Sequence, residues 1–124
     1  MKLLSVVALF GFLGVVFGAF GAHAIADTVS PERLIVYKTG VLYHLLHTVA
    51  ALGVVLLALR FPLWKQLSKV IYLFLMGIVV FSGSLYSLVI FDVPMLGAVT
   101  PIGGTLLLAG WALLAIYAWG VNHD

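Results

Sequence analysis

The stretch VIYLFLMGIVVFSGSLYSLVIF, residues 70–91, indicates a membrane-spanning helix because it contains no charged side chain from end to end. The hydrocarbon core of a bilayer is about 30 Å thick, so a helix needs about 20 apolar residues to cross it. Three other stretches of the chain meet the same requirement. The sequence therefore predicts an all-α, integral membrane four-helix bundle that forms a single transmembrane domain. We expect its helices at about residues 3–22, 31–59, 70–91 and 101–119 of the chain 1–124.

The composition of the whole chain excludes a soluble protein. Of 124 residues, 65% are hydrophobic and 8% are charged, and the mean hydropathy is +1.27. A soluble domain this short leaves much of its surface in water and could not bury so many apolar residues. The six Lys and Arg residues are too few and too scattered for a nucleic-acid-binding face. With no cysteine, the chain has no disulfide, no thiolate nucleophile and no thiolate-bound metal.

The first apolar stretch has a second interpretation. Lys2, the apolar run and the triplet Ala22-His23-Ala24 imitate a secretory signal with a small-x-small cleavage site. The run is nevertheless long enough to span a bilayer. We therefore expect it to be retained as the first transmembrane helix.

Basic residues in short loops predict the orientation, because cytoplasmic loops of membrane proteins carry the excess of Lys and Arg. With four spans, the two termini and the second loop share one side of the membrane, and this side carries more basic residues than the other. The residues compared are Lys2, Arg60, Lys65 and Lys69 against Arg33 and Lys38. We therefore expect both termini in the cytoplasm and the first and third loops outside.

Two helix starts carry a capping signal. Ser30 is followed by Pro31 and Glu32, which is typical of a cap, a first helical position and an acid at the positive end of the helix dipole. Thr100 and Pro101 repeat the first two features before residues 101–119. Both starts lie on the predicted outer side.

Four glycines of the first predicted helix are spaced three, four and three residues apart, which puts them on one face. They are Gly11, Gly14, Gly18 and Gly21. Small residues four apart let another helix backbone approach closely. The spacing predicts a helix-packing face, either within the bundle or between copies of the chain. A ligand groove against bare backbone is the rarer alternative.

Two histidines lie deep in the second predicted helix. His44 and His47 are three residues apart and occupy neighbouring positions of one face. Counted from Lys38 at about 1.5 Å per residue, they lie roughly 9 and 13 Å into the membrane. Ionisable groups at such depth are rare and usually face the bundle interior. A neutral histidine bonded to a neighbouring carbonyl, a proton or substrate site, and a metal or haem ligand are the three interpretations. His123 lies in the tail and receives no role.

Other polar residues map to the same outer half of the membrane. The first helix ends at His23, the third contains the segment 82–87, and the fourth opens with bare glycines that could receive an anion or a carbonyl oxygen. Local packing and capping explain each feature equally well. Because four helices enclose one interior, we expect these groups to converge on one pocket in the outer leaflet. The ligand-binding candidates are His23, His44, His47, Ser84, Tyr86, Gly103 and Gly104.

Four short segments carry a resemblance to a known family. They are GAFGAH at 18–23, YHLLH at 43–47, SGSLY at 82–86 and TPIGG at 100–104. In this order and spacing they resemble the signature segments of the domain-of-unknown-function family 423, which includes the transmembrane protein 256-like proteins. The resemblance implies a small four-helix protein of the bacterial inner membrane. It implies no reaction, because the family has no established biochemistry.

Two classes of function fit the sequence. The first is a non-enzymatic membrane protein that binds a lipid, a quinone-like molecule or a partner subunit. The second is a small proton-coupled transporter that uses the membrane-embedded histidines. An enzyme is disfavoured, because nothing marks Ser84 and His44 as an activated nucleophile and base. No cofactor or metal signature is present. Membrane lipid is the expected partner, and the sequence also permits a homo-oligomer or a membrane partner protein.

Overall fold

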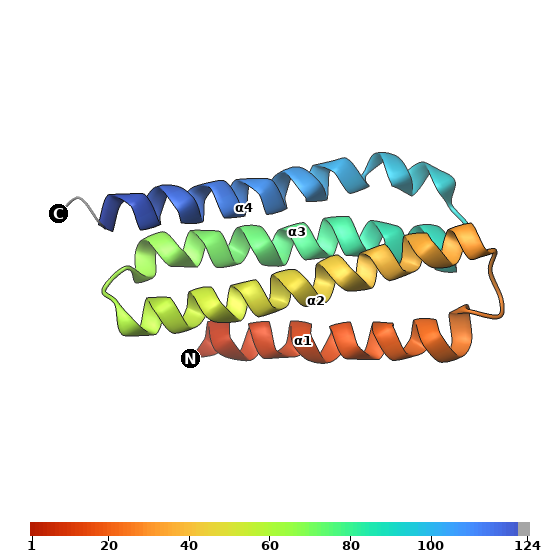
Figure 1. Ribbon diagram of the computed structural model, residues 1–124, viewed down its shortest axis with the longest axis horizontal. Coiled ribbons are helices and arrows are strands. Elements are labelled where there is room, and N and C mark those ends of the chain that lie inside the picture. The colour runs from red at the N-terminus through yellow and green to blue at the C-terminus, as the bar shows by residue number, and fades with distance from the viewer. Residues whose placement is uncertain (122–124) are drawn as a thin grey trace.

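The computed structural model describes residues 1–121, so His123 lies outside the described part of the chain. Four long helices and two short helical turns make up this part, in the order shown in Figure 1. All four long helices are apolar and long enough to cross a membrane. Their bounds are α1, Lys2–Phe20; a π-helical turn η1, Gly21–Ile25; α2, Pro31–Arg60; α3, Trp64–Ile90; a 3-10 turn η2, Pro94–Ala98; and α4, Thr100–Val121.

Two helices begin where capping residues and interfacial turns allow, and not where the apolar runs begin. Ser30 caps α2, because its hydroxyl accepts a hydrogen bond from the Arg33 backbone N–H at 3.2 Å, and Pro31 takes the first helical position. The third helix begins at Trp64 and not at residue 70. Apolar runs mark where a helix crosses the hydrocarbon core, whereas the charged turns before residue 70 lie at the interface, where long basic side chains reach water.

The predicted cap at Thr100 is wrong. The 3-10 turn η2 leads almost directly into α4, so no free helix end is left for a threonine to cap. The Thr100 hydroxyl instead lies 2.6 Å from the Ser84 hydroxyl on α3. It also donates weakly to the Leu96 carbonyl at 3.4 Å. This residue therefore joins α4 to α3.

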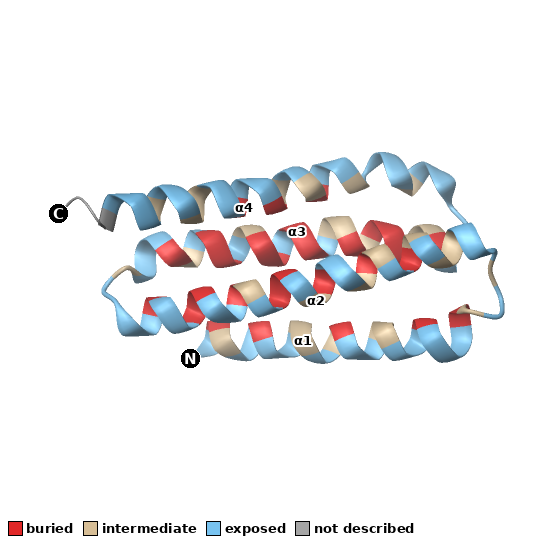
Figure 2. Ribbon diagram, in the orientation of Figure 1, coloured by how far each residue is buried: buried red, intermediate tan, exposed pale blue. Residues whose placement is uncertain are grey.

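Successive helices run antiparallel, with α2 and α3 in the centre of the molecule (Figure 1). Helix α1 packs mainly on α2, and α4 packs mainly on α3. We call the end that carries the start of α1, the turn 61–63 and the end of α4 the termini end, and the end that carries the loop 26–30 and residues 91–99 the loop end. Figure 2 shows that buried positions concentrate on α2 and α3, whereas α1 and α4 are mostly exposed.

The glycine face of α1 lies against α2. A methyl group on Gly14 would come within 2.6 Å of Leu45 Cδ2, and one on Gly21 would collide with the Tyr37 ring. Gly18 faces Val41 and Gly11 faces Thr48, so the four contacts follow one another along two antiparallel helices. The stripe therefore packs within the bundle in this structure, and α1 approaches α2 closely along its length.

Candidate functional site

His44 joins three helices through both of its ring nitrogens. Its Nε2 lies 2.8 Å from the Phe10 carbonyl on α1, and its Nδ1 lies 3.0 Å from the Tyr86 hydroxyl on α3. Because a carbonyl can only accept, Nε2 carries the proton and donates to it. In the neutral ring Nδ1 is then the acceptor for the Tyr86 hydroxyl. The imidazole is buried, and its hydrogen-bonding capacity is fully used.

The surroundings of His44 are closely packed. Ser82 donates to the Gly40 carbonyl on α2 at 2.6 Å, and Tyr37 donates to the Phe17 carbonyl on α1 at 2.5 Å. The Phe17 ring stacks on Tyr86 with 4.4 Å between ring centroids. These contacts bind α1, α2 and α3 by polar groups that are satisfied inside the protein, as the absence of water in a bilayer requires.

His47 faces a different neighbour. Its Nδ1 donates to the Tyr43 carbonyl of its own helix at 2.9 Å, and its Nε2 accepts a hydrogen bond from Trp111 Nε1 on α4 at 3.0 Å. The Phe74 ring of α3 meets the imidazole edge-on, with 5.5 Å between centroids. His47 is therefore also a neutral ring. It links α2 to α4 through Trp111 and packs against Phe74 of α3.

An apolar cleft of about 610 Å³ lies beside His47, between α2 and α4. This volume falls in the range of about 300–1,000 Å³ that is typical of small-molecule sites. Phe81 of α3 contributes to its lining, together with residues of both flanking helices. The lining includes Tyr43, Leu46, His47, Phe81, Gly104, Leu108 and Trp111.

Close packing of α3 and α4 accounts for two of the predicted site residues. Ser84 donates to the Phe81 carbonyl at 2.8 Å and also lies next to Thr100. A methyl group on Gly103 would collide with the Phe81 backbone nitrogen and lie 2.6 Å from its Cα atom. Gly104 is one residue farther along and has room, since a methyl group there would be 3.8 Å from the nearest Phe81 atom.

The prediction that all candidates share one pocket is wrong. His44 and Tyr86 lie on the α1 side of the α2–α3 pair, and His47 and Gly104 line the cleft on the α4 side. His23 is exposed in the turn η1 and belongs neither to the contacts of His44 nor to the lining of the cleft.

The separation of the two histidines has a geometric cause. At 3.6 residues per turn, positions three apart differ by about 60° around the helix. For a central helix with a neighbour on either side, this difference directs the two rings to different partners. Whether any candidate binds a ligand stays a prediction.

The sequence reasoning missed Trp111 and Tyr43, which shape the cleft and hold His47. Trp111 follows Gly104 by seven residues and therefore lies on the same face of α4, which is a signal that could have found it. Nothing local in the sequence indicates that its indole N–H meets His47.

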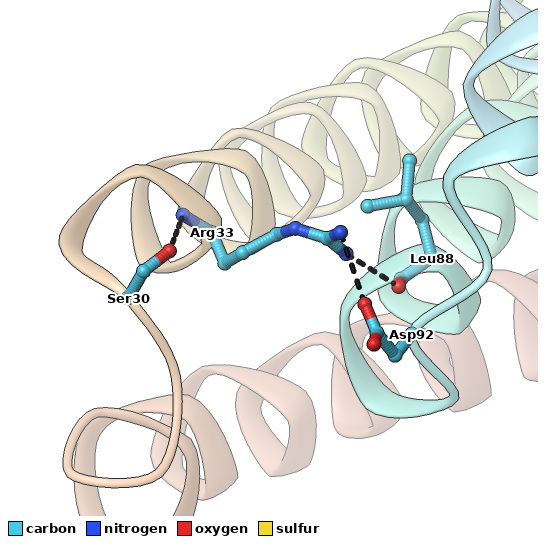
Figure 3. Close-up of polar contacts among 4 residues, drawn as sticks. All are labelled: Ser30, Arg33, Leu88 and Asp92. Atoms are coloured by element: carbon cyan, nitrogen blue, oxygen red, sulfur yellow. Dashed lines mark hydrogen bonds and ion pairs between the residues drawn. The ribbon is translucent and has the colours of Figure 1, made fainter.

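A polar contact at the loop end ties α2 to α3. Arg33 donates to the Leu88 carbonyl at 3.1 Å and forms an ion pair with Asp92 at 3.0 Å (Figure 3). A cation at the C-terminal end of α3 is also favoured by the helix dipole. The side chains are 30% and 84% exposed, so we expect this pair to contribute no more than about 1 kcal/mol to stability.

Within residues 1–121, no group of three or more His, Cys, Asp or Glu side chains could hold a metal ion.

Comparisons with known proteins agree on one family. The model of the family described as "Protein of unknown function (DUF423)" matches residues 17–104. A UPF0382 membrane protein of Haemophilus influenzae is 44% identical over 92% of this chain and 90% of its own length. The UPF0382 inner membrane protein YgdD of Escherichia coli K12 is 39% identical over 94% and 92%. The UPF0382 membrane protein YwdK of Bacillus subtilis is 36% identical over 90% of each chain. No solved structure matches the chain.

Proposed function

The chain belongs to the DUF423 family and is a multi-pass protein of the bacterial inner membrane, and from this premise we propose that it is a non-enzymatic binding protein. Its ligand is a membrane molecule with a long apolar chain, such as a lipid or a quinone-like molecule. The binding site is the cleft between α2 and α4. The observation that carries the proposal is the volume of this cleft, about 610 Å³, together with its apolar and aromatic lining.

The depth of the cleft fits a chain from one leaflet. Counted from Lys38 at about 1.5 Å per residue, Tyr43 lies roughly 8 Å and His47 roughly 13 Å into the membrane. Since half of the hydrocarbon core is about 15 Å thick, the cleft occupies the leaflet at the loop end. The charge distribution predicts this leaflet to be the outer one. A cleft open to hydrocarbon does not stay empty, because its lining would forfeit dispersion contacts.

The cleft also offers one polar group to a ligand. The Tyr43 hydroxyl forms no hydrogen bond within residues 1–121, although its ring packs against Phe81 with 4.5 Å between centroids. A hydroxyl at this depth is suited to donate to an ester or ring carbonyl. The proposal therefore combines apolar walls with a single hydrogen-bond donor at the shallow end.

Proton-coupled transport through the histidines has weaker support. His44 and His47 each use one nitrogen as donor and the other as acceptor, so neither holds a free nitrogen for an arriving proton. A proton could reach His47 Nε2 only after the bond from Trp111 breaks. Proton flux into liposomes that contain the purified protein tests this alternative. A flux lost in the His47→Gln variant would favour transport over binding.

Two matched glycine variants test the proposed site. Gly104→Leu adds a side chain that fills the cleft, and Gly53→Leu adds the same side chain at a position with nothing within 4 Å. We expect native mass spectrometry of protein incubated with an inner-membrane lipid extract to detect the same number of retained molecules in the wild type and in Gly53→Leu. Gly104→Leu should retain one molecule fewer while eluting at the same volume. Equal retention by both variants would refute the assignment of the cleft.

A further inference from the structure

A second apolar cleft lies at the termini end of the molecule. Its volume is about 260 Å³, and it is bounded by the end of α2, the turn 61–63, the first turns of α3 and the end of α4. Like the first cleft, it lies between α2 and α4, but in the other half of the membrane. Its lining includes Leu57, Phe61, Leu67, Leu114, Tyr117 and Ala118. No charged side chain contributes to this lining.

An arginine lies next to this second cleft. The Arg60 guanidinium carbon lies 5.3 Å from the centroid of the Phe61 ring, and that ring lines the cleft. Within residues 1–121, Arg60 forms no ion pair, and the acidic side chains Asp27, Glu32 and Asp92 all belong to the loop end. The guanidinium is thus uncompensated by protein carboxylates in the described part of the chain.

We propose that the second cleft binds one anionic phospholipid of the adjoining leaflet. One acyl chain lies in the apolar cleft, and the phosphate receives hydrogen bonds from the Arg60 guanidinium. Arginine suits this role because its planar fork matches phosphate oxygens in a bidentate arrangement. The Phe61 ring holds the guanidinium beside the cleft by a cation–π contact. An anionic headgroup is preferred to a zwitterionic one because the zwitterionic headgroup brings a positive charge of its own close to the arginine.

The charge requirement is tested with two variants that remove the same charge from the same end. Arg60→Gln removes the proposed phosphate ligand, whereas Lys65→Gln removes a lysine that is exposed and lines neither cleft. Native mass spectrometry in detergent with dioleoylphosphatidylglycerol should show one bound lipid, and dioleoylphosphatidylcholine should bind more weakly. We expect Arg60→Gln to weaken phosphatidylglycerol binding at least about fivefold. Lys65→Gln should change it by less than about twofold at 0.15 M salt.

The acyl-chain requirement is tested in the same way. Ala118→Leu fills the second cleft, and Ala112→Leu adds the same volume at an exposed position that lines neither cleft. Only Ala118→Leu should lose the bound phosphatidylglycerol. Equal losses of phosphatidylglycerol in Arg60→Gln and Lys65→Gln would show diffuse attraction to a basic surface and would overturn the proposal. Full retention of phosphatidylglycerol by Ala118→Leu would overturn it as well. Gly104→Leu should leave this lipid bound, so failure of the first site and failure of the second are distinguishable.

Discussion

Alanine substitutions at Gly103 and Gly104 distinguish a position where two helices are in close contact from a neighbouring position that has free space. Gly103 is the position in close contact, and Gly104 is the position with free space. A methyl group on Gly103 would lie 2.6 Å from the Phe81 Cα atom and still closer to its backbone nitrogen. A methyl group on Gly104 would lie 3.8 Å from its nearest neighbour, the Phe81 Cδ2 atom, which is an ordinary contact. The first substitution therefore forces α3 and α4 apart, and the second does not.

The expected cost follows from these distances. Carbon atoms pack best at about 3.5–4.0 Å, so relieving the contact at Gly103 requires a separation of about 1 Å. A gap of about 0.5–1 Å forfeits a quarter to a half of each dispersion contact across it. Overpacking of this kind costs about 1–3 kcal/mol, and the upper end applies because Phe81 meets the methyl group with its backbone, which cannot rotate away. Both variants gain the same helix propensity over glycine, so this gain cancels in the comparison.

The free energy of unfolding in mixed micelles, measured by titration with a denaturing detergent, tests the comparison. We expect Gly103→Ala to be less stable than Gly104→Ala by about 3 kcal/mol, with Gly104→Ala close to the wild type. Equal stability of the two variants would contradict this expectation, because it would mean that α3 and α4 are not in backbone contact at Gly103.

Three further predictions concern other contacts of the bundle. Tyr86→Phe removes the hydroxyl that donates to His44, so the same titration should detect a loss of about 0.6–1.7 kcal/mol, and an unchanged stability would contradict this hydrogen bond. Gly14→Leu inserts a side chain where α1 meets α2 and should lower the yield of monodisperse protein in size-exclusion chromatography; normal yield would place this glycine face toward lipid. A topology reporter inserted in the loop 26–30 should read external and one in the turn 61–63 cytoplasmic, and the reverse pair of signals would invert the whole protein.

Features that depend on neighbouring residues could be predicted from the sequence. Uncharged runs gave the class of protein and the four helices, since a bilayer accepts long apolar helices and few other structures. The start of α2 was predictable, because a serine cap and a following proline act within one turn. The spacing of Gly14 and Gly18 indicated a face for close packing, because periodicity along one helix is a local property.

The hydrogen-bond partner of each polar group depends on how the four helices pack, and the sequence does not show it. Sequence spacing placed His44 and His47 on adjacent positions of one helix, but their partners Tyr86 and Trp111 come from α3 and α4, far away along the chain. The order of helices across the bundle sets these meetings, and this order depends on the summed packing of all four helices. The same holds for the two clefts, which exist because α2 and α4 flank α3 without closing over it. Packing between distant segments leaves no pattern in a single sequence. For that reason the sequence predicts one shared pocket, whereas the structure separates the residues around His44 from those around His47.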